Sequence, residues 1–238
     1  MDRQGRQPDA TPVRSDDEAV AEQQRLAALV ELQPFPSLPV VACGVDVSYG
    51  PGPDDSAVAV AVVIDTGDFS VQDRATASGR VDTAYRAGML SFRELPLLLE
   101  AVARLAEPPP LIVADGHGYA HPERFGLASH LGVVTGIATI GCAKAAFVGT
   151  HGAVGPDRGE WADIVDRGVV VGSAVRTRSR VKPVYVSPGH LVDVESARRL
   201  VLALCPRFRL PETTRLADQI GRQIIRDRSS PRGPGEPS

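Results

Sequence analysis

The sequence predicts a single α/β domain built on a mixed sheet, with an antiparallel meander, parallel strands and helices on both faces. Three observations predict this fold class. The 238 residues are 43% hydrophobic and 23% charged, which is typical of a soluble globular domain with a sizeable core. Three Val- or Thr-rich runs that end in glycine follow one another early in the chain, as in a meander. Further along, strand-like and helical patterns alternate, which favours parallel strands joined by helices.

The elements of the first half can be assigned in order. A helix is expected from Asp16, because apolar residues recur at helical spacing until Pro34 stops the pattern. The polar residues 1–15 before it are expected to form a disordered tail. The three strands of the meander follow at residues 39–50, 56–67 and 69–79. Residues 91–106 then predict a helix, since a proline such as Pro96 is tolerated near the first turn.

The second half begins with a short buried strand at residues 111–115. A helix is expected to open at Pro122, and residues 138–149 predict a strand that runs into a loop. Residues 167–189 predict two strands about a basic turn. Residues 193–205 predict a helix capped by Asp193, and residues 213–228 predict a final helix. The predicted domain therefore covers residues 16–227. The Pro-, Gly- and Ser-rich residues 228–238 are expected to form a second disordered tail.

The net charge of −3 does not exclude a nucleic-acid partner. Residues 1–32 contain seven acidic and four basic residues, which accounts for the whole −3 and leaves the remainder balanced. The three cysteines lie in apolar segments and are an odd number, which predicts buried thiols in a reducing compartment. No apolar run reaches the roughly 18 residues of a membrane span, and the N-terminus lacks the apolar stretch of a signal peptide. We therefore expect a cytoplasmic protein that does not bind membranes.

Two aspartates lie in apolar strands, where a carboxylate is unusual. Asp46 stands among Val, Ala and Cys residues, and a buried carboxylate is costly unless it is paired or bound to a cation. Asp115 ends another apolar strand and is followed by Gly116 and Gly118, which let a ligand approach the backbone closely. Either aspartate alone can simply cap a turn or a helix. The two together predict a site for a divalent metal ion.

Three further residues can join this site, and each has an ordinary alternative. Glu94, near the start of a helix, can form a capping box with Ser91. Asp218 can lie on a solvated helix face. Lys144 follows an apolar strand, where it can neutralise charge on a phosphate or simply reach water. These residues favour a catalytic site only as a set with the two aspartates.

Zinc is the alternative metal, because Asp115, His117 and His121 are spaced like transition-metal ligands. The two histidines do not lie one turn apart on a single helix, since His117 stands between glycines and His121 precedes Pro122. They can instead form hydrogen bonds with a substrate, whereas His130 is expected to satisfy its hydrogen bonds within a helix.

Basic residues alternate through the segment AVRTRSRVK, at residues 174–182. Period-two spacing would place them on one face of an extended segment, as Arg176, Arg178, Arg180 and Lys182. No acidic residue lies between Arg167 and Val192. The segment predicts a ridge that contacts phosphates, although a sheet edge protected by charge has the same composition.

Six sequence blocks together resemble the endonuclease V family, the deoxyinosine 3′ endonucleases of DNA repair. The blocks are GVDVSY (44–49), GMLSFRE (88–94), DGHGYAHPERFGLASHLGV (115–133), TIGCAK (139–144), VKPVYVSPGH (181–190) and RLPETTRLAD (209–218). The resemblance runs from about Ala19 to Arg226. It implies an RNase H-like fold and Mg²⁺-dependent hydrolysis of the second phosphodiester bond 3′ to a deaminated base, chiefly hypoxanthine. The products would carry 3′-hydroxyl and 5′-phosphate ends.

The resemblance also implies roles for individual residues. The implied metal ligands are Asp46, Glu94 and Asp115. Asp218 would be a catalytic carboxylate beside them, and Lys144 would be a catalytic lysine near the scissile phosphate. A pocket around the displaced base would be formed by Gly88, Leu90, Gly116, His121 and Gly141. Tyr85 matches the aromatic residue of a wedge that fills the gap left by the displaced base.

The wedge departs from the family pattern. Ala84-Tyr85-Arg86-Ala87 stands where the family usually has Pro-Tyr-Ile-Pro, so both prolines and their rigidity are lost. We expect weaker strand opening, and phosphate binding by Arg86 that favours single-stranded or mismatched substrates.

The resemblance implies Mg²⁺ as the cofactor, with Mn²⁺ as a substitute, and one or two ions are compatible with the sequence. The implied partner is DNA that contains deaminated bases, or inosine-containing RNA, and the protein is expected to be a monomer. Two alternatives stay open. One is a different RNase H-like nuclease that acts on branched DNA, and the other is an inactive nucleic-acid-binding relative.

Overall fold

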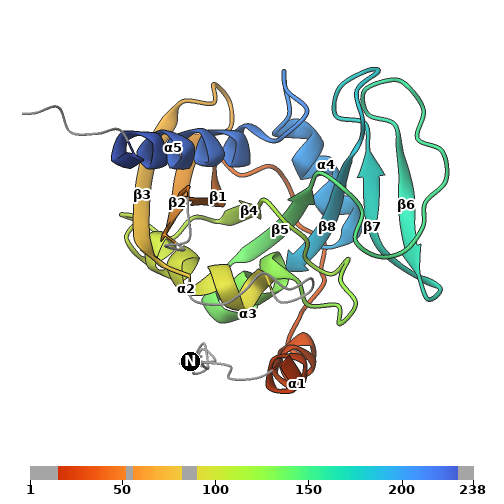
Figure 1. Cartoon of the computed structure of the whole chain (residues 1–238). Coiled ribbons are helices and arrows are strands. Elements are labelled where there is room, and N and C mark those ends of the chain that lie inside the picture. Colours follow the sequence, from red (N-terminus) through yellow and green to blue (C-terminus); the bar gives the residue numbers. More distant parts are fainter. Residues whose placement is uncertain (1–15, 52–55, 82–89, 230–238) are drawn as a thin grey trace, which may run out of the picture.

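The computed structural model describes residues 16–51, 56–81 and 90–229. Its strands form one mixed sheet in the order β3-β2-β1-β4-β5-β8-β7-β6, with helices on both faces (Figure 1), so the predicted fold class is confirmed. The strands of this described part are β1 (Val41–Tyr49), β2 (Ser56–Asp65), β3 (Val71–Arg80), β4 (Leu111–Ala114), β5 (Ala138–Ala143), β6 (Trp161–Asp166), β7 (Val169–Val175) and β8 (Val184–His190). Its helices are α1 (Asp16–Ala27), α2 (Leu90–Ala103), α3 (Leu127–Thr135), α4 (Val194–Ala203) and α5 (Glu212–Ser229).

The sheet combines the predicted meander with a parallel centre. β1, β2 and β3 pair antiparallel, whereas β1, β4 and β5 pair parallel. β8, β7 and β6 then extend the sheet beyond β5 by antiparallel pairing. In the parallel centre, Val45 pairs with Ala114 and Ala114 pairs with Gly141. The carboxyl ends of β1, β4 and β5 therefore lie at the same edge of the sheet, which is where α/β proteins form their sites.

Apolar side chains on both faces of the sheet determine where the helices pack. On one face, α2 and α3 bury Leu95, Leu98 and Leu131 against β1 and β2. On the other face, α5 packs on β2 and α4 packs on β5 and β8. Gly44 lets α5 lie directly on β1, because a Cβ atom at this position would be 2.2 Å from the backbone carbonyl of Thr213. The same face of β1 carries Asp46, so α5 runs beside this aspartate.

Two helices differ from the sequence prediction in their bounds. α1 ends at Ala27 rather than continuing to Pro34, because the chain turns there and the amide of Val30 donates to the carbonyl of Ala27. α3 begins at Leu127 rather than at Pro122. Arg124 has a φ of 56°, in the left-handed region, so residues 122–125 cannot form the first turn of this helix.

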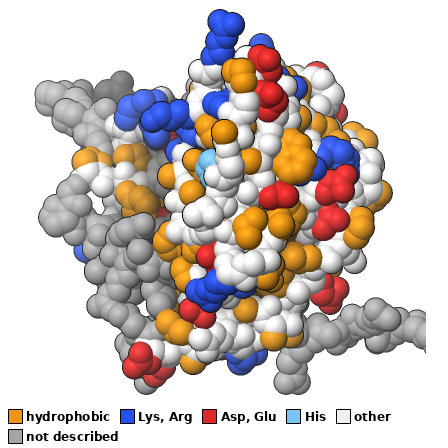
Figure 2. Space-filling model, turned by 90° about the vertical axis from the view of Figure 1, so that its right-hand side faces the viewer, with side chains coloured by type: hydrophobic (Ala, Val, Ile, Leu, Met, Phe, Trp, Pro, Cys, Tyr) orange, Lys and Arg blue, Asp and Glu red, His pale blue; other side chains and the backbone are white. Residues whose placement is uncertain are grey.

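The edge strand β6 has no counterpart in the sequence prediction. Its sequence WADIVD places charged residues among apolar ones and lacks a clear strand signal. At this edge, Trp161, Val165 and Val170 are between 39% and 44% exposed. Figure 2 looks onto this side of the molecule and shows hydrophobic side chains interspersed with charged ones.

Several smaller expectations are confirmed. The three cysteines are free and buried, and the side chain of Asp193 accepts a hydrogen bond from the amide of Ser196 at the start of α4.

The predicted C-terminal tail begins too early. α5 continues to Ser229, so residues 228 and 229 belong to a helix and not to a tail. The other residues of both predicted tails lie outside the described ranges. No helix in the described ranges is long and apolar enough to cross a membrane.

Candidate active site

The topology brings the five predicted catalytic residues to one pocket. Asp46 lies on β1, Asp115 follows β4 and Lys144 follows β5, so all three stand at the same edge of the parallel centre. Glu94 reaches the pocket from α2 and Asp218 from α5. Together these side chains line a pocket of about 550 Å³. Residues that are far apart in the sequence thus form one acidic site with a single lysine among them.

Asp46 is the most crowded of the carboxylates. Burial, and after it the nearby charges of Asp115 and Asp218, raise the pKa of Asp46 to about 7. The positive charges of Lys144 and Arg222 oppose this effect. The site therefore gathers more negative charge than its own cations compensate.

Glu94 is buried, with 7% of its surface exposed, and it has a specific partner. The hydroxyl of Tyr49 donates a hydrogen bond to Glu94 Oε1 at 2.7 Å. The pKa of Glu94 is raised to about 7, chiefly by burial and also by the charges of Asp46 and Asp115, while the hydrogen bond from Tyr49 partly opposes the shift. The alternative of a capping box is wrong, because Ser91 lies inside the helix and its buried Oγ has no hydrogen-bond partner among the described residues.

Lys144 is held by one of these carboxylates. Its Nζ atom lies 2.5 Å from Asp115 Oδ2. Burial lowers the pKa of Lys144, but the hydrogen bond and the charge of Asp115 outweigh burial and the net shift is upward. The side chain is therefore an ammonium ion, and since it is 47% exposed it can meet a ligand in the pocket.

The donor set of this pocket fits a hard divalent cation. Carboxylate oxygens are the ligands that Mg²⁺ prefers, and a cation would relieve the repulsion that raises the pKa values of Asp46 and Glu94. In the described ranges, no three Asp, Glu, His or Cys side chains converge into a ready-made metal cluster. The zinc alternative, through Asp115, His117 and His121, therefore finds no such cluster either.

A second cavity of about 280 Å³ adjoins the acidic pocket and shares Asp115 and Lys144 with it. Its lining is mainly apolar and includes Gly116, His121 and Phe147. Gly116 and His121, two of the residues that the resemblance assigns to the base pocket, thus line this cavity. Gly141 lies behind them, and only glycine fits there, because a Cβ atom would be 2.6 Å from the carbonyl oxygen of Gly116. Tyr85, Arg86, Gly88 and the side chain of Leu90 lie outside the described residues.

His117 forms part of the same cavity. Burial lowers the pKa of His117 to about 4, so the imidazole is neutral at pH 7. Its Nδ1 atom is buried and has no hydrogen-bond partner among the described residues.

Comparison with known proteins identifies the family. A sequence profile of endonuclease V matches residues 24–219. The chain belongs to the endonuclease V family. The chain is 51% identical to an endonuclease V of Roseiflexus sp. (strain RS-1) over 177 aligned residues. The aligned region covers 74% of this chain and 78% of the relative. As a member of this family, the chain is a nuclease that hydrolyses DNA.

Solved structures of endonuclease V share the fold. The crystal structure of the Streptomyces avermitilis protein superposes with a TM-score of 0.87 at 45% identity, over 93% of this chain and 98% of that one. The endonuclease V of Ciona intestinalis was solved in complex with a DNA that contains an inosine followed by a ribo-adenosine. It superposes with a TM-score of 0.80 at 25% identity, over 90% of this chain and 98% of that one.

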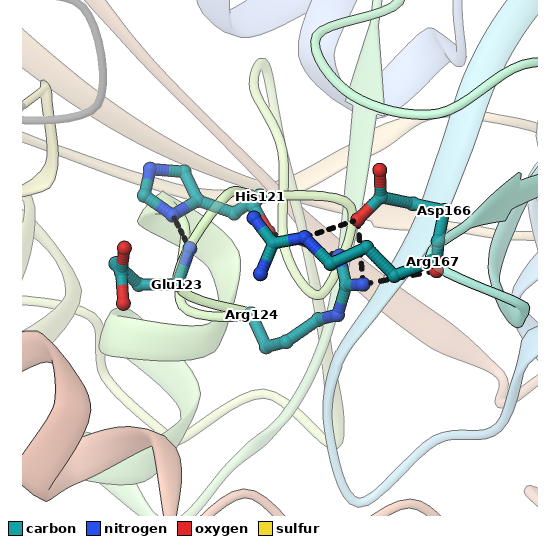
Figure 3. Close-up of polar contacts among 5 residues, drawn as sticks. All are labelled: His121, Glu123, Arg124, Asp166 and Arg167. Carbon is teal, nitrogen blue, oxygen red and sulfur yellow. Dashed lines mark hydrogen bonds and ion pairs between the residues drawn. The ribbon is translucent and has the colours of Figure 1, made fainter.

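In this endonuclease V, the loop that carries His121 is tied to the turn between β6 and β7 (Figure 3). Arg124 donates to Asp166 Oδ2 at 2.6 Å and to the Asp166 carbonyl at 3.1 Å, and also to the carbonyl of His121 at 3.2 Å. The His121 Nδ1 atom accepts a hydrogen bond from the amide of Glu123 at 3.2 Å. Sequence reasoning missed this link, because it depends on β6 and on two residues 42 positions apart.

The predicted basic ridge is wrong in its geometry. Residues 176–183 of this endonuclease V lie between β7 and β8 and form no strand, and Arg180 has a φ of 62°. Alternate residues therefore do not share one face. The guanidinium of Arg176 donates instead to three backbone carbonyl groups, those of residues 154, 155 and 181. The side chains that stay exposed are Arg178, Arg180 and Lys182, and phosphate contact by these three stays a prediction.

Proposed function

We propose that this endonuclease V recognises deaminated bases in DNA, chiefly hypoxanthine, and hydrolyses the second phosphodiester bond 3′ to the lesion. The products are a 3′-hydroxyl and a 5′-phosphate end. One observation carries the proposal: the acidic pocket and the apolar cavity adjoin and share Asp115 and Lys144. A base in the cavity would therefore leave the neighbouring backbone beside the carboxylates. The inosine-containing DNA bound to the Ciona intestinalis relative supports the same substrate class.

Asp46, Glu94 and Asp115 are the residues that would hold Mg²⁺, or Mn²⁺ as its substitute, with Asp218 beside them. When bound, the ion supplies a water of lowered pKa and charge stabilisation at the leaving 3′ oxygen. The chain's own groups prepare this site. The hydroxyl of Tyr49 fixes one oxygen of Glu94, which keeps that carboxylate turned into the pocket.

Lys144 would contact the scissile phosphate in the proposed reaction. Its ammonium group lies against Asp115 and is half-exposed to the pocket. A phosphate that enters the pocket would meet this positive charge directly. Lys144 can then stabilise negative charge that develops on the scissile phosphate.

The base would enter the apolar cavity, where Gly116 and His121 lie and which Gly141 supports from behind. Outside the described residues, Tyr85 would fill the gap left by the base, and Gly88 and Leu90 would complete the pocket. The exposed residues Arg178, Arg180 and Lys182 are proposed to contact phosphates. We further propose that the protein acts as a monomer in the cytoplasm.

Labelled oligonucleotides test this function. Strands that contain inosine, uracil or no lesion are incubated with the protein in Mg²⁺ or in EDTA. We expect Mg²⁺-dependent nicking one nucleotide beyond inosine, and its loss in Asp46→Asn but not in the control Asp163→Asn, which changes an aspartate on the distant strand β6. Absence of such nicking would reject the proposal.

Two further substrates address the alternatives. Cleavage of branched DNA without inosine would favour another RNase H-like nuclease, and comparison of DNA with inosine-containing RNA defines the preferred nucleic acid. An inactive relative would show no difference between the unsubstituted protein and Asp46→Asn on any strand.

A further inference from the structure

Phe147 is a large apolar side chain in an unusual place. It lies three residues after Lys144, in the exposed segment that follows β5, and 40% of its surface is exposed. It also lines the apolar cavity beside the acidic pocket. Single exposed apolar residues are common on protein surfaces, but this one stands at the opening of a cavity next to the candidate catalytic residues.

The ring of Phe147 belongs to a cluster of flat side chains. Its centroid lies 5.6 Å from the ring of His117 and 5.4 Å from the ring of His121. Apolar side chains from Leu127 and Ala143 line the same cavity. An aromatic face that is partly free and surrounded by apolar walls is suited to a flat, aromatic ligand.

The loop that carries His117 and His121 is fixed on the sheet, so the two rings that contact Phe147 are held in place. The amide of Gly118 donates to Ser187 Oγ at 2.9 Å, and the amide of Tyr119 donates to the carbonyl of Pro188 at 2.7 Å. At the other end of the loop, Arg124 ties the carbonyl of His121 to Asp166 (Figure 3). A surface that is ordered before binding loses little conformational freedom when a ligand stacks on it.

We propose that Phe147 stacks on the displaced nucleobase and so determines how tightly the cavity retains it. This inference rests on the proposed function, since it takes the cavity as the base pocket. Stacking on an aromatic side chain tolerates every base, because every base has a π-face. Phe147 would therefore increase affinity for any base in the cavity, while the choice of lesion depends on the polar groups around it.

Single-stranded oligonucleotides test the proposal without the cost of opening a duplex. Dissociation constants are measured in EDTA for three strands of one sequence, which carry inosine, the unmodified purine or an abasic analogue at the same position. The variants are Phe147→Leu, which keeps an apolar side chain but removes the ring, and Phe147→Tyr, which keeps the ring. Phe208→Leu is the matched control, because Phe208 is 41% exposed and stacks on Arg215 instead of lining the cavity.

We expect the unsubstituted protein, Phe147→Tyr and Phe208→Leu to bind the inosine strand about 10-fold or more tightly than the abasic strand. Phe147→Leu should lose this ratio and keep its affinity for the abasic strand, which has no base to stack. An unchanged ratio in Phe147→Leu overturns the proposal, and so does an equal loss on both strands, which would indicate a merely structural role. If the unsubstituted protein does not prefer inosine to the unmodified purine, the proposed function itself fails.

Discussion

At the scale of single residues, Asp46 shows how a residue proposed for catalysis can reduce stability. Its carboxylate is buried on β1 and repelled by Asp115 and Asp218. Asp46→Asn removes this repulsion and should raise the free energy of unfolding, measured in EDTA, by about 0.5–2 kcal/mol, whereas cleavage measured in Mg²⁺ should be lost. Urea denaturation at pH 8 measures the change. The control Asp163→Asn should stay within about 0.5 kcal/mol of the unsubstituted protein, and a less stable Asp46→Asn would contradict the argument.

His130 makes the stability of the domain depend on pH. The side chain is 2% exposed, between the rings of Phe92 and Phe125, and its Nδ1 atom has no hydrogen-bond partner among the described residues. The expectation that His130 satisfies its hydrogen bonds within the helix is therefore wrong for this atom. Burial lowers the pKa of His130 to about 4, and the charge of Glu22 on α1 opposes this only in part.

The sign of the effect follows from this shift. The unfolded chain binds a proton on His130 near pH 6.5, whereas the folded protein does so only near pH 4. Stability is therefore lost as the pH falls from about 6.5 to 4, by on the order of 3 kcal/mol. Denaturation of the unsubstituted protein and of His130→Gln at several pH values tests this, because the contributions of other groups cancel in the difference. The stability of the unsubstituted protein relative to His130→Gln should fall by on the order of 3 kcal/mol between pH 7 and pH 4, and parallel pH curves would refute the assignment.

At the scale of elements, the Arg124–Asp166 pair links the β6–β7 turn to the cavity wall. Both side chains are 18% exposed, and Arg124 serves as a positioning residue for His121 because it also holds the carbonyl of that residue. Asp166→Ala should cost about 1–3 kcal/mol of stability, because the arginine loses its charged partner in a half-buried site. It should raise KM for an inosine strand more than it lowers kcat.

Arg167→Ala provides a matched control for this pair. Arg167 approaches the same Asp166 oxygen at 3.6 Å but is 71% exposed, so its removal should change stability by less than about 1 kcal/mol. Arg124→Lys should behave like Asp166→Ala, since an ammonium cannot reproduce the separate contacts of the guanidinium. Equal effects of Arg167→Ala and Asp166→Ala would show that the link has no special role.

The elements also show what sequence reasoning can and cannot reach. Asp46 and Asp115 could be predicted because an acidic residue in an apolar strand is conspicuous, and parallel strands bring such ends together. Asp218 could not be distinguished from a solvated helix residue, because only the packing of α5 on Gly44 brings it to the pocket. Phe147 and the β6 strand carry no periodic signal, and their positions depend on long-range contacts.

At the scale of the whole molecule, net charge is a poor guide to the ligand. The −3 of the chain arises in residues 1–32, whereas the pocket at the sheet edge combines carboxylates with Lys144, Arg222 and Arg226. Four carboxylates against three cations leave the pocket short of positive charge. This local imbalance, and not the overall charge, determines what the folded protein should bind.

A divalent cation should therefore stabilise the entire fold. A ligand that binds only the folded protein at 100 times its dissociation constant adds about 2.7 kcal/mol to the free energy of unfolding. For a domain of this size, Mg²⁺ should then raise Tm by roughly 5–10 °C, and EDTA should reverse the change. Scanning calorimetry measures the shift, which Asp163→Asn should retain and Asp46→Asn should largely lose. An unchanged Tm at Mg²⁺ concentrations that support cleavage would contradict the claim that Mg²⁺ binding in the carboxylate pocket stabilises the fold.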